Sequence, residues 1–133
     1  MNVKNTMLLL ERFPKLFRPD PELKQNLMAF GFECGNGWNS ILWKLCLDLS
    51  FMLKKMKGRK PDPEYSDFQV MQVKEKLGTL RFYVNWATDQ MYDRIRQAEE
   101  ESARTCEVCG LPGKLRDDGW LQTLCDECWE KNK

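Results

Sequence analysis

Four of the six cysteines form two closely spaced pairs near the C-terminal end of the chain. The pairs are Cys106-Glu-Val-Cys109 and Cys125-Asp-Glu-Cys128, with fifteen residues between them. Two such pairs at this separation are typical of a structural zinc site, because each tight turn brings two thiolates to one side of a soft cation. Four thiolates fill a tetrahedron and leave no position for water. The pattern therefore predicts one structural Zn²⁺ and argues against a catalytic zinc; a redox dithiol pair and an iron site remain as alternatives.

The residues between the pairs predict a zinc ribbon over 105–133. Gly110 follows the first pair, where a knuckle needs a permissive backbone. The segments 114–116 and 120–124 flank Asp117-Asp118-Gly119, which contains a hairpin turn signal. The module has too few apolar residues to fold on a core of its own, so metal coordination must supply much of its folding free energy. Trp120 and Trp129 are expected to cover the metal site.

Other catalytic chemistry has little support. The chain contains no histidine, which excludes Ser-His and Cys-His nucleophile pairs and imidazole proton shuttles. Cys34 precedes a glycine turn and a helix start, where a helix dipole can lower a thiol pKa. Without a neighbouring base, a buried structural cysteine is the favoured interpretation of Cys34. Cys46 lies within the long apolar helix and is expected to be a residue of the hydrophobic core.

The charge distribution favours a protein partner. The net charge is +1, with +6 over residues 1–61 and −5 over 62–133. A near-neutral chain is a poor candidate for a non-specific nucleic-acid coat, although one basic patch can still bind phosphates. No leader segment is recognisable, and the apolar region 41–53 is interrupted by Lys44 and Asp48. We therefore expect a cytoplasmic protein whose cysteines bind metal.

Two clusters of side chains are candidate contacts for a protein or a nucleic acid. One is a basic run at the end of the longest predicted helix. A helix C-terminus complementing its own dipole is the favoured interpretation of this run, because no aromatic residue lies between the lysines as a stacking platform would require. The other is a mixed basic and aromatic face on a predicted hairpin, which equally suits an ordinary solvent face. Trp120 is a third candidate. The basic run comprises Lys54, Lys55, Lys57, Arg59 and Lys60, and the hairpin face comprises Lys74, Arg81 and Tyr83.

The pattern of apolar residues predicts an α+β fold. A long central helix packs on a small antiparallel sheet or hairpin, a second helix follows, and the zinc ribbon ends the chain. We expect an α+β domain over 1–104 and the ribbon module over 105–133. The long helix is capped by Asn39 or Ser40, ended by Gly58 and apolar enough to be covered on two sides. The expected elements are helices at 1–13, 22–28, 39–57 and from Thr88 for about four turns, a strand at 30–34 and a hairpin at 68–86.

Three segments carry a resemblance to a known group of proteins. They are Phe30-Gly-Phe-Glu-Cys-Gly-Asn-Gly-Trp38, Gln72-Val-Lys-Glu-Lys-Leu-Gly-Thr-Leu-Arg-Phe-Tyr83, and the terminal CEVCG and CDEC motifs. Together they resemble a functionally unassigned family of small proteins from bacterial genomes and phages. The resemblance covers about residues 30–128. It implies an accessory or phage-borne role, in the bacterial cytosol or a phage-infected cell, and carries over no catalytic residue.

Three functional hypotheses follow. The leading one is a non-catalytic, zinc-stabilised accessory protein that acts by protein–protein contact, for example as a host-interaction or anti-defence factor of a phage or mobile element. The alternative is a nucleic-acid-binding zinc-ribbon protein that uses the ribbon, the basic run and Arg81. An enzyme would need Cys34 as a thiolate nucleophile, and it is the least favoured of the three.

Overall fold

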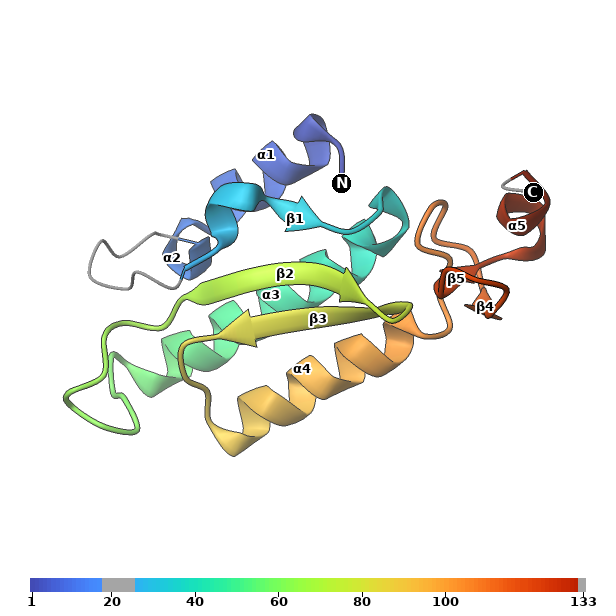
Figure 1. Ribbon diagram of the computed structural model, residues 1–133. Coiled ribbons are helices and arrows are strands. Elements are labelled where there is room, and N and C mark those ends of the chain that lie inside the picture. Colours follow the sequence, from blue (N-terminus) through green and yellow to red (C-terminus); the bar gives the residue numbers. More distant parts are fainter. Residues whose placement is uncertain (18–25, 132–133) are drawn as a thin grey trace.

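The computed structural model describes residues 1–17 and 26–131 and shows an α+β fold (Figure 1). A three-stranded sheet has the order β1-β2-β3, with β1 parallel to β2 and β2 antiparallel to β3. A separate two-stranded hairpin lies near the C-terminal end. The strands are β1 (Phe32–Glu33), β2 (Val70–Lys76), β3 (Thr79–Val84), β4 (Lys114–Arg116) and β5 (Gln122–Leu124).

Four of the described α-helices share one large apolar core, and α5 lies beside a second, small one in the ribbon. Their bounds are α1 (Val3–Arg12), α2 (Pro14–Phe17), α3 (Asn39–Met56), α4 (Asp89–Ser102) and α5 (Asp126–Lys131), with 3-10 turns η1 (Met28–Phe30) and η2 (Asn36–Trp38). The core joins α1, α2, α3, α4 and the sheet, and it includes Leu9, Trp38, Leu45, Val73 and Met91, each fully buried. Burial of this apolar surface is the main stabilising contribution to the fold.

The predicted hairpin and second helix are confirmed. The apolar side chains of β3 alternate as expected, with Leu80 and Phe82 buried and Tyr83 exposed. Thr88 caps α4, because its side-chain oxygen accepts a hydrogen bond from the backbone N–H of Met91 at 3.2 Å. The apolar stripe of α4 then packs against α3 and β3.

The predictions around β1 were less accurate. The strand covers only Phe32–Glu33 of the predicted 30–34, because Phe30 belongs to η1 and is 72% exposed. Most of the helical turn predicted at 22–28 lies outside the described residues. β1 pairs in parallel with the central strand β2, so the sheet is mixed rather than purely antiparallel.

The long helix α3 begins and ends as predicted but differs in its cap and its exposure. The preceding turn η2 leads directly into α3, so neither Asn39 nor Ser40 provides a side-chain cap. One side contacts α4 and another contacts Phe13, whose ring meets Trp43 edge to face. Leu47 and Phe51, which widen the apolar stripe in the sequence, remain 43% and 60% exposed. Apolar residues on this side of α3 therefore do not contribute to the core.

Candidate metal centre

The four paired cysteines converge at one point. Their sulfur atoms all lie within 4.8 Å of one another, and the Sγ atoms of Cys109 and Cys125 are 3.6 Å apart. Sulfurs bound to one tetrahedral zinc at 2.3 Å are about 3.8 Å apart, so the cluster has the dimensions of a metal site. Cys106 and Cys125 are buried, Cys128 is partly buried and Cys109 is exposed. The predicted ligand set can therefore hold one metal ion.

The two turns that present the thiols have the hydrogen bonds of metal-binding knuckles. After the first pair, Gly110 has φ +83° and donates its N–H to the carbonyl of Cys106 at 2.9 Å. In the second pair the N–H of Cys128 points at the sulfur of Cys125 at 3.4 Å. Gly110 thus occupies the left-handed region that the sequence assigns to it. Both turns direct their sulfur atoms into the same cluster.

The electrostatics of the cluster also suit a cation. Burial opposes ionisation of Cys106, but backbone N–H groups of Cys125, Cys109 and Val108 outweigh it and lower its pKa to about 7. The thiol hydrogen bond with Cys125, followed by burial, raises the pKa of Cys128 to about 12. Adjacent thiolates repel one another, so four can coexist here only with a positive ion between them. The donor set, four soft sulfurs, fits a soft divalent metal.

The first knuckle is docked on a glycine turn of the α+β part. Gly37 donates its N–H to the carbonyl of Glu107 at 2.7 Å, and Gly35 donates to the Glu107 carboxylate at 2.9 Å. The indole N–H of Trp38 donates to the carbonyl of Thr105 at 2.9 Å. A Cβ at Gly37 would lie 2.1 Å from the carbonyl oxygen of Cys106. The predicted turn at 35–37 is therefore the surface on which the knuckle rests.

The ribbon hairpin makes a second contact, with the turn between β2 and β3. The Thr123 hydroxyl donates to the carbonyl of Gly78 at 2.6 Å, and both groups are buried. A Cβ at Gly78 would lie 2.6 Å from the Cδ1 atom of Leu115. The domain boundary between residues 104 and 105 stays a prediction. The ribbon contacts the α+β part across this boundary at two turns, those of Gly37 and Gly78.

Arg116 is a structural residue of the ribbon that the sequence analysis missed. Its guanidinium donates to the carbonyl of Leu124 at 3.0 and 3.1 Å and to the Asp126 carboxylate at 2.8 Å. It also lies over the ring of Trp129, 5.5 Å from the centroid. Its hydrogen bond lowers the pKa of Asp126. The sequence signal was weak, since a single arginine in a charged hairpin resembles any surface cation.

The two tryptophans of the ribbon have different positions. Trp129 is partly buried and packs against the small core of Cys106, Leu124 and Cys125, as predicted. Trp120 was expected to cover the metal site, and this prediction was wrong: it is 74% exposed, in the turn between β4 and β5. The turn that the Asp-Gly step predicts leaves the ring outside the ribbon core.

The basic run lies far from the cysteine cluster. Lys54 and Lys55 are in the last turn of α3, while Trp38, next to the start of α3, contacts the ribbon. Eighteen helical residues span about 27 Å, so the run and the ribbon are at opposite ends of α3 (Figure 1). Lys60 pairs with Asp67 at 3.1 Å. The structure therefore does not join the basic run to the ribbon in one patch.

The candidate hairpin residues do lie together. Lys74 is the register partner of Arg81, and Tyr83 follows two residues along β3, so all three share one sheet face. This face is opposite to the buried Leu80 and Phe82. The Nε atom of Arg81 is buried without a hydrogen-bond partner among the described residues. The predicted mixed basic and aromatic face is thus formed.

Cys34 lacks the surroundings of a nucleophile. It is buried, and burial raises the pKa of its thiol to about 12. We expect iodoacetamide to leave Cys34 unmodified in the folded protein at pH 8, and to modify it only after denaturation, as measured by peptide mass spectrometry. The Cys34 thiol has a pKa of about 9 in the unfolded chain and about 12 in the folded protein. Its ionisation therefore lowers the free energy of unfolding as the pH rises from about 9 to about 12. Rapid modification of the folded protein would contradict the assignment.

Comparison with known proteins adds no relative: no family model, curated protein or solved structure matches the chain. The resemblance to a family of bacterial and phage proteins therefore stays a prediction. Among the described residues, no helix combines the length and the apolar character that crossing a bilayer requires.

Proposed function

We propose that this protein is a non-catalytic, zinc-stabilised interaction protein whose ribbon presents a binding surface to a protein partner. The four converging cysteines support the metal, because four thiolate donors in a closed set favour Zn²⁺ in a structural role. The same closed set supports a non-catalytic metal, since no ligand position is open to substrate.

The observation that carries the interaction role is a set of exposed apolar side chains on and beside the ribbon. Each is at least half exposed, although large apolar residues in a folded domain are usually buried. We call this set the ribbon apolar surface, and it consists of Leu77, Val108, Leu111, Leu115 and Trp120. The metal centre and the two docked turns hold these residues in place. Exposed tryptophan and leucine side chains on one small module can act as anchors for a protein partner.

A partner-capture experiment tests the proposal. Tagged wild-type protein is used to capture binding proteins from bacterial lysates under several conditions, with Leu111→Ser/Trp120→Ser and Lys54→Gln/Lys55→Gln as variants. We expect one stoichiometric partner with the wild type and the lysine variant, and about a hundredfold weaker binding with the ribbon variant, because two anchors are lost. Leu111 and Trp120 are 55% and 74% exposed and neither side chain belongs to the contacts at Gly37 or Gly78, so their replacement should leave the fold intact.

Nucleic-acid binding is the alternative that this experiment separates. It would require phosphate contacts from Arg81 and the basic run, with an affinity that falls steeply with salt. Binding to single- or double-stranded DNA at low ionic strength, weakened in the lysine variant and unchanged in the ribbon variant, would favour this alternative over the proposal only if no stoichiometric protein partner is captured. The absence of any stoichiometric partner would contradict the proposal.

The biological setting that we propose is an accessory role, such as a host-interaction or anti-defence factor of a phage or mobile element. Its support is the sequence resemblance together with the exposed apolar side chains of the ribbon. A partner that belongs to a host defence or regulatory complex would agree with this setting.

A further inference from the structure

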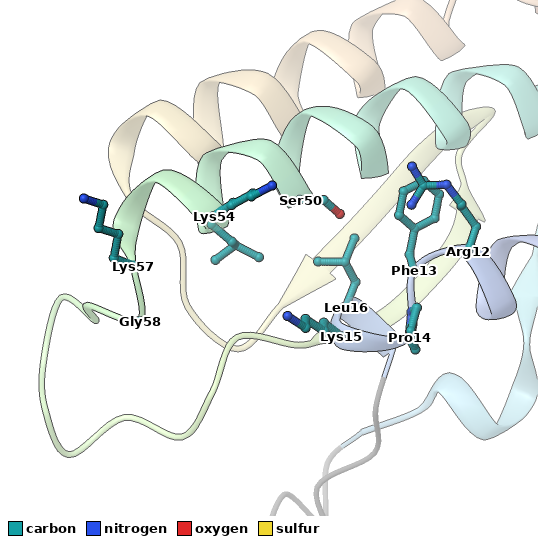
Figure 2. A pocket seen from close by; sticks show the side chains of 10 residues that line it. Arg12, Phe13, Pro14, Lys15, Leu16, Ser50, Lys54, Lys57 and Gly58 are labelled. Atoms are coloured by element: carbon teal, nitrogen blue, oxygen red, sulfur yellow. The ribbon is translucent and has the colours of Figure 1, made fainter.

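A hollow of about 600 Å³ lies between the corner of α1 and α2 and the C-terminal half of α3 (Figure 2). This volume is within the range of small-molecule sites, about 300–1,000 Å³. Arg12 and Lys15 belong to one wall, and Lys54 and Lys57 belong to the other. The Ser50 hydroxyl adds a neutral donor. No carboxylate lines the hollow within the described part of the chain.

The positive charge around this hollow is larger than the partial negative charge of the two helix C-termini beside it. Cations near helix C-termini complement the partial negative charge there, which is about half a unit for each helix. The ends of α1 and α3 thus offset about one of the four positive charges, and about three remain. None of the four cations forms an ion pair with a described residue, whereas Lys60, Arg94 and Arg116 each pair with an aspartate. The unpaired charge favours an anion.

We propose that this hollow binds a phosphate group, carried by a small phosphorylated molecule or by a nucleic-acid backbone. Cations on two facing walls can contact several oxygens of one phosphate or diphosphate, and a hydroxyl can donate to another. The proposal goes beyond the proposed function and does not depend on it, because the ribbon apolar surface is at the other end of α3 (Figure 1).

An acidic protein segment suits the hollow less well. Such a segment gains affinity from apolar side chains as well as from charge. The apolar residues Phe13 and Leu16 of the lining are only 2% and 1% exposed. The Arg12 guanidinium also lies over the Phe13 ring, 5.0 Å from its centroid. Pro14 is exposed and Leu53 is half-buried, so the accessible lining combines cations with some apolar surface. The four cations, with no carboxylate among the described lining residues, favour a compact, highly charged group over a long acidic segment.

The test is a titration of the zinc-loaded protein with pyrophosphate, followed by amide NMR and calorimetry. We expect shifts at Lys15, Ser50 and Gly58, and an affinity about tenfold lower in Lys15→Gln/Lys54→Gln, because two charge-assisted contacts are removed. The variant Lys4→Gln/Lys44→Gln makes the same change in net charge at exposed positions outside the hollow. Its affinity for pyrophosphate should equal that of the wild type within about twofold.

Two further probes separate the sources of the phosphate. If ADP binds more tightly than a ten-nucleotide DNA strand, the phosphate group belongs to a small phosphorylated molecule. If the DNA strand binds more tightly than ADP, it belongs to a nucleic-acid backbone. The proposal is overturned if pyrophosphate does not bind, or if both lysine variants bind it equally. It is also overturned if hexaglutamate binds as tightly as pyrophosphate, since the hollow would then be a general acceptor of acidic segments.

Discussion

Replacing Cys106 with serine is expected to unfold the ribbon while leaving the α+β core folded. The Cys106 sulfur is fully buried at the centre of the cluster, and its loss leaves three thiols for a site that needs four ligands. Structural zinc supplies roughly 10 kcal/mol or more of apparent folding free energy in small zinc modules. Besides the cysteines, the small core of the ribbon contains Leu124 and the partly buried Trp129. Packing alone therefore cannot hold this segment.

Amide NMR and metal analysis measure this outcome. The signals of residues 107–131 should collapse to unfolded positions and the bound metal should fall below one equivalent. Signals of Leu45, Val73 and Ile95 should stay dispersed, because these residues belong to the separate, larger core. Cys46→Ala is the matched control: it removes a buried thiol outside the cluster, should retain the metal and should cost about 1–2 kcal/mol. A folded ribbon in the Cys106 variant would refute the interpretation.

Gly37→Ala is expected to have the second-largest effect, although Gly37 binds no metal. An added methyl group would lie 2.1 Å from the carbonyl oxygen of Cys106 and 2.6 Å from the carbonyl carbon of Glu107. Both are backbone atoms of the metal knuckle, so a side-chain rotation cannot relieve the contact. The shift would also break the hydrogen bond from the Gly37 N–H to Glu107. We expect a loss of about 3 kcal/mol in the free energy of unfolding and weaker metal retention.

Chemical denaturation and a competitive zinc chelator measure the two effects of Gly37→Ala. Gly119→Ala is the control, since nothing lies within 4 Å of the added methyl group there. The φ of Gly119 is +103°, so the control should lose about 1 kcal/mol through backbone strain alone. Equal losses in the two variants would show that the knuckle does not rest on Gly37.

The sequence predicted those parts of the fold that depend on local patterns. The alternation of Leu80, Phe82 and Tyr83 and the Thr88 cap are local signals, and the structure confirms both. The four cysteines could be assigned because a metal knuckle is defined by spacing within a few residues. These features can be recognised without knowing which residues pack against them.

The features that the sequence did not reveal depend on distant segments. Gly35 and Gly37 were predicted as a turn, but their contact with Glu107 joins residues about seventy positions apart. The exposure of Trp120 likewise depends on how the ribbon hairpin is oriented. The short β1 strand forms through pairing with β2, which lies about forty residues later. Propensity carries no information about such long-range contacts.

The claim on which the rest depends is that a single zinc ion organises the C-terminal segment. Elemental analysis of the purified protein, combined with amide NMR before and after EDTA, tests it most directly. We expect one Zn²⁺ per chain, with EDTA unfolding residues 105–131 and added zinc restoring them. A protein purified with no zinc, with iron in its place, or with a ribbon that keeps its structure after complete metal removal, would contradict the account.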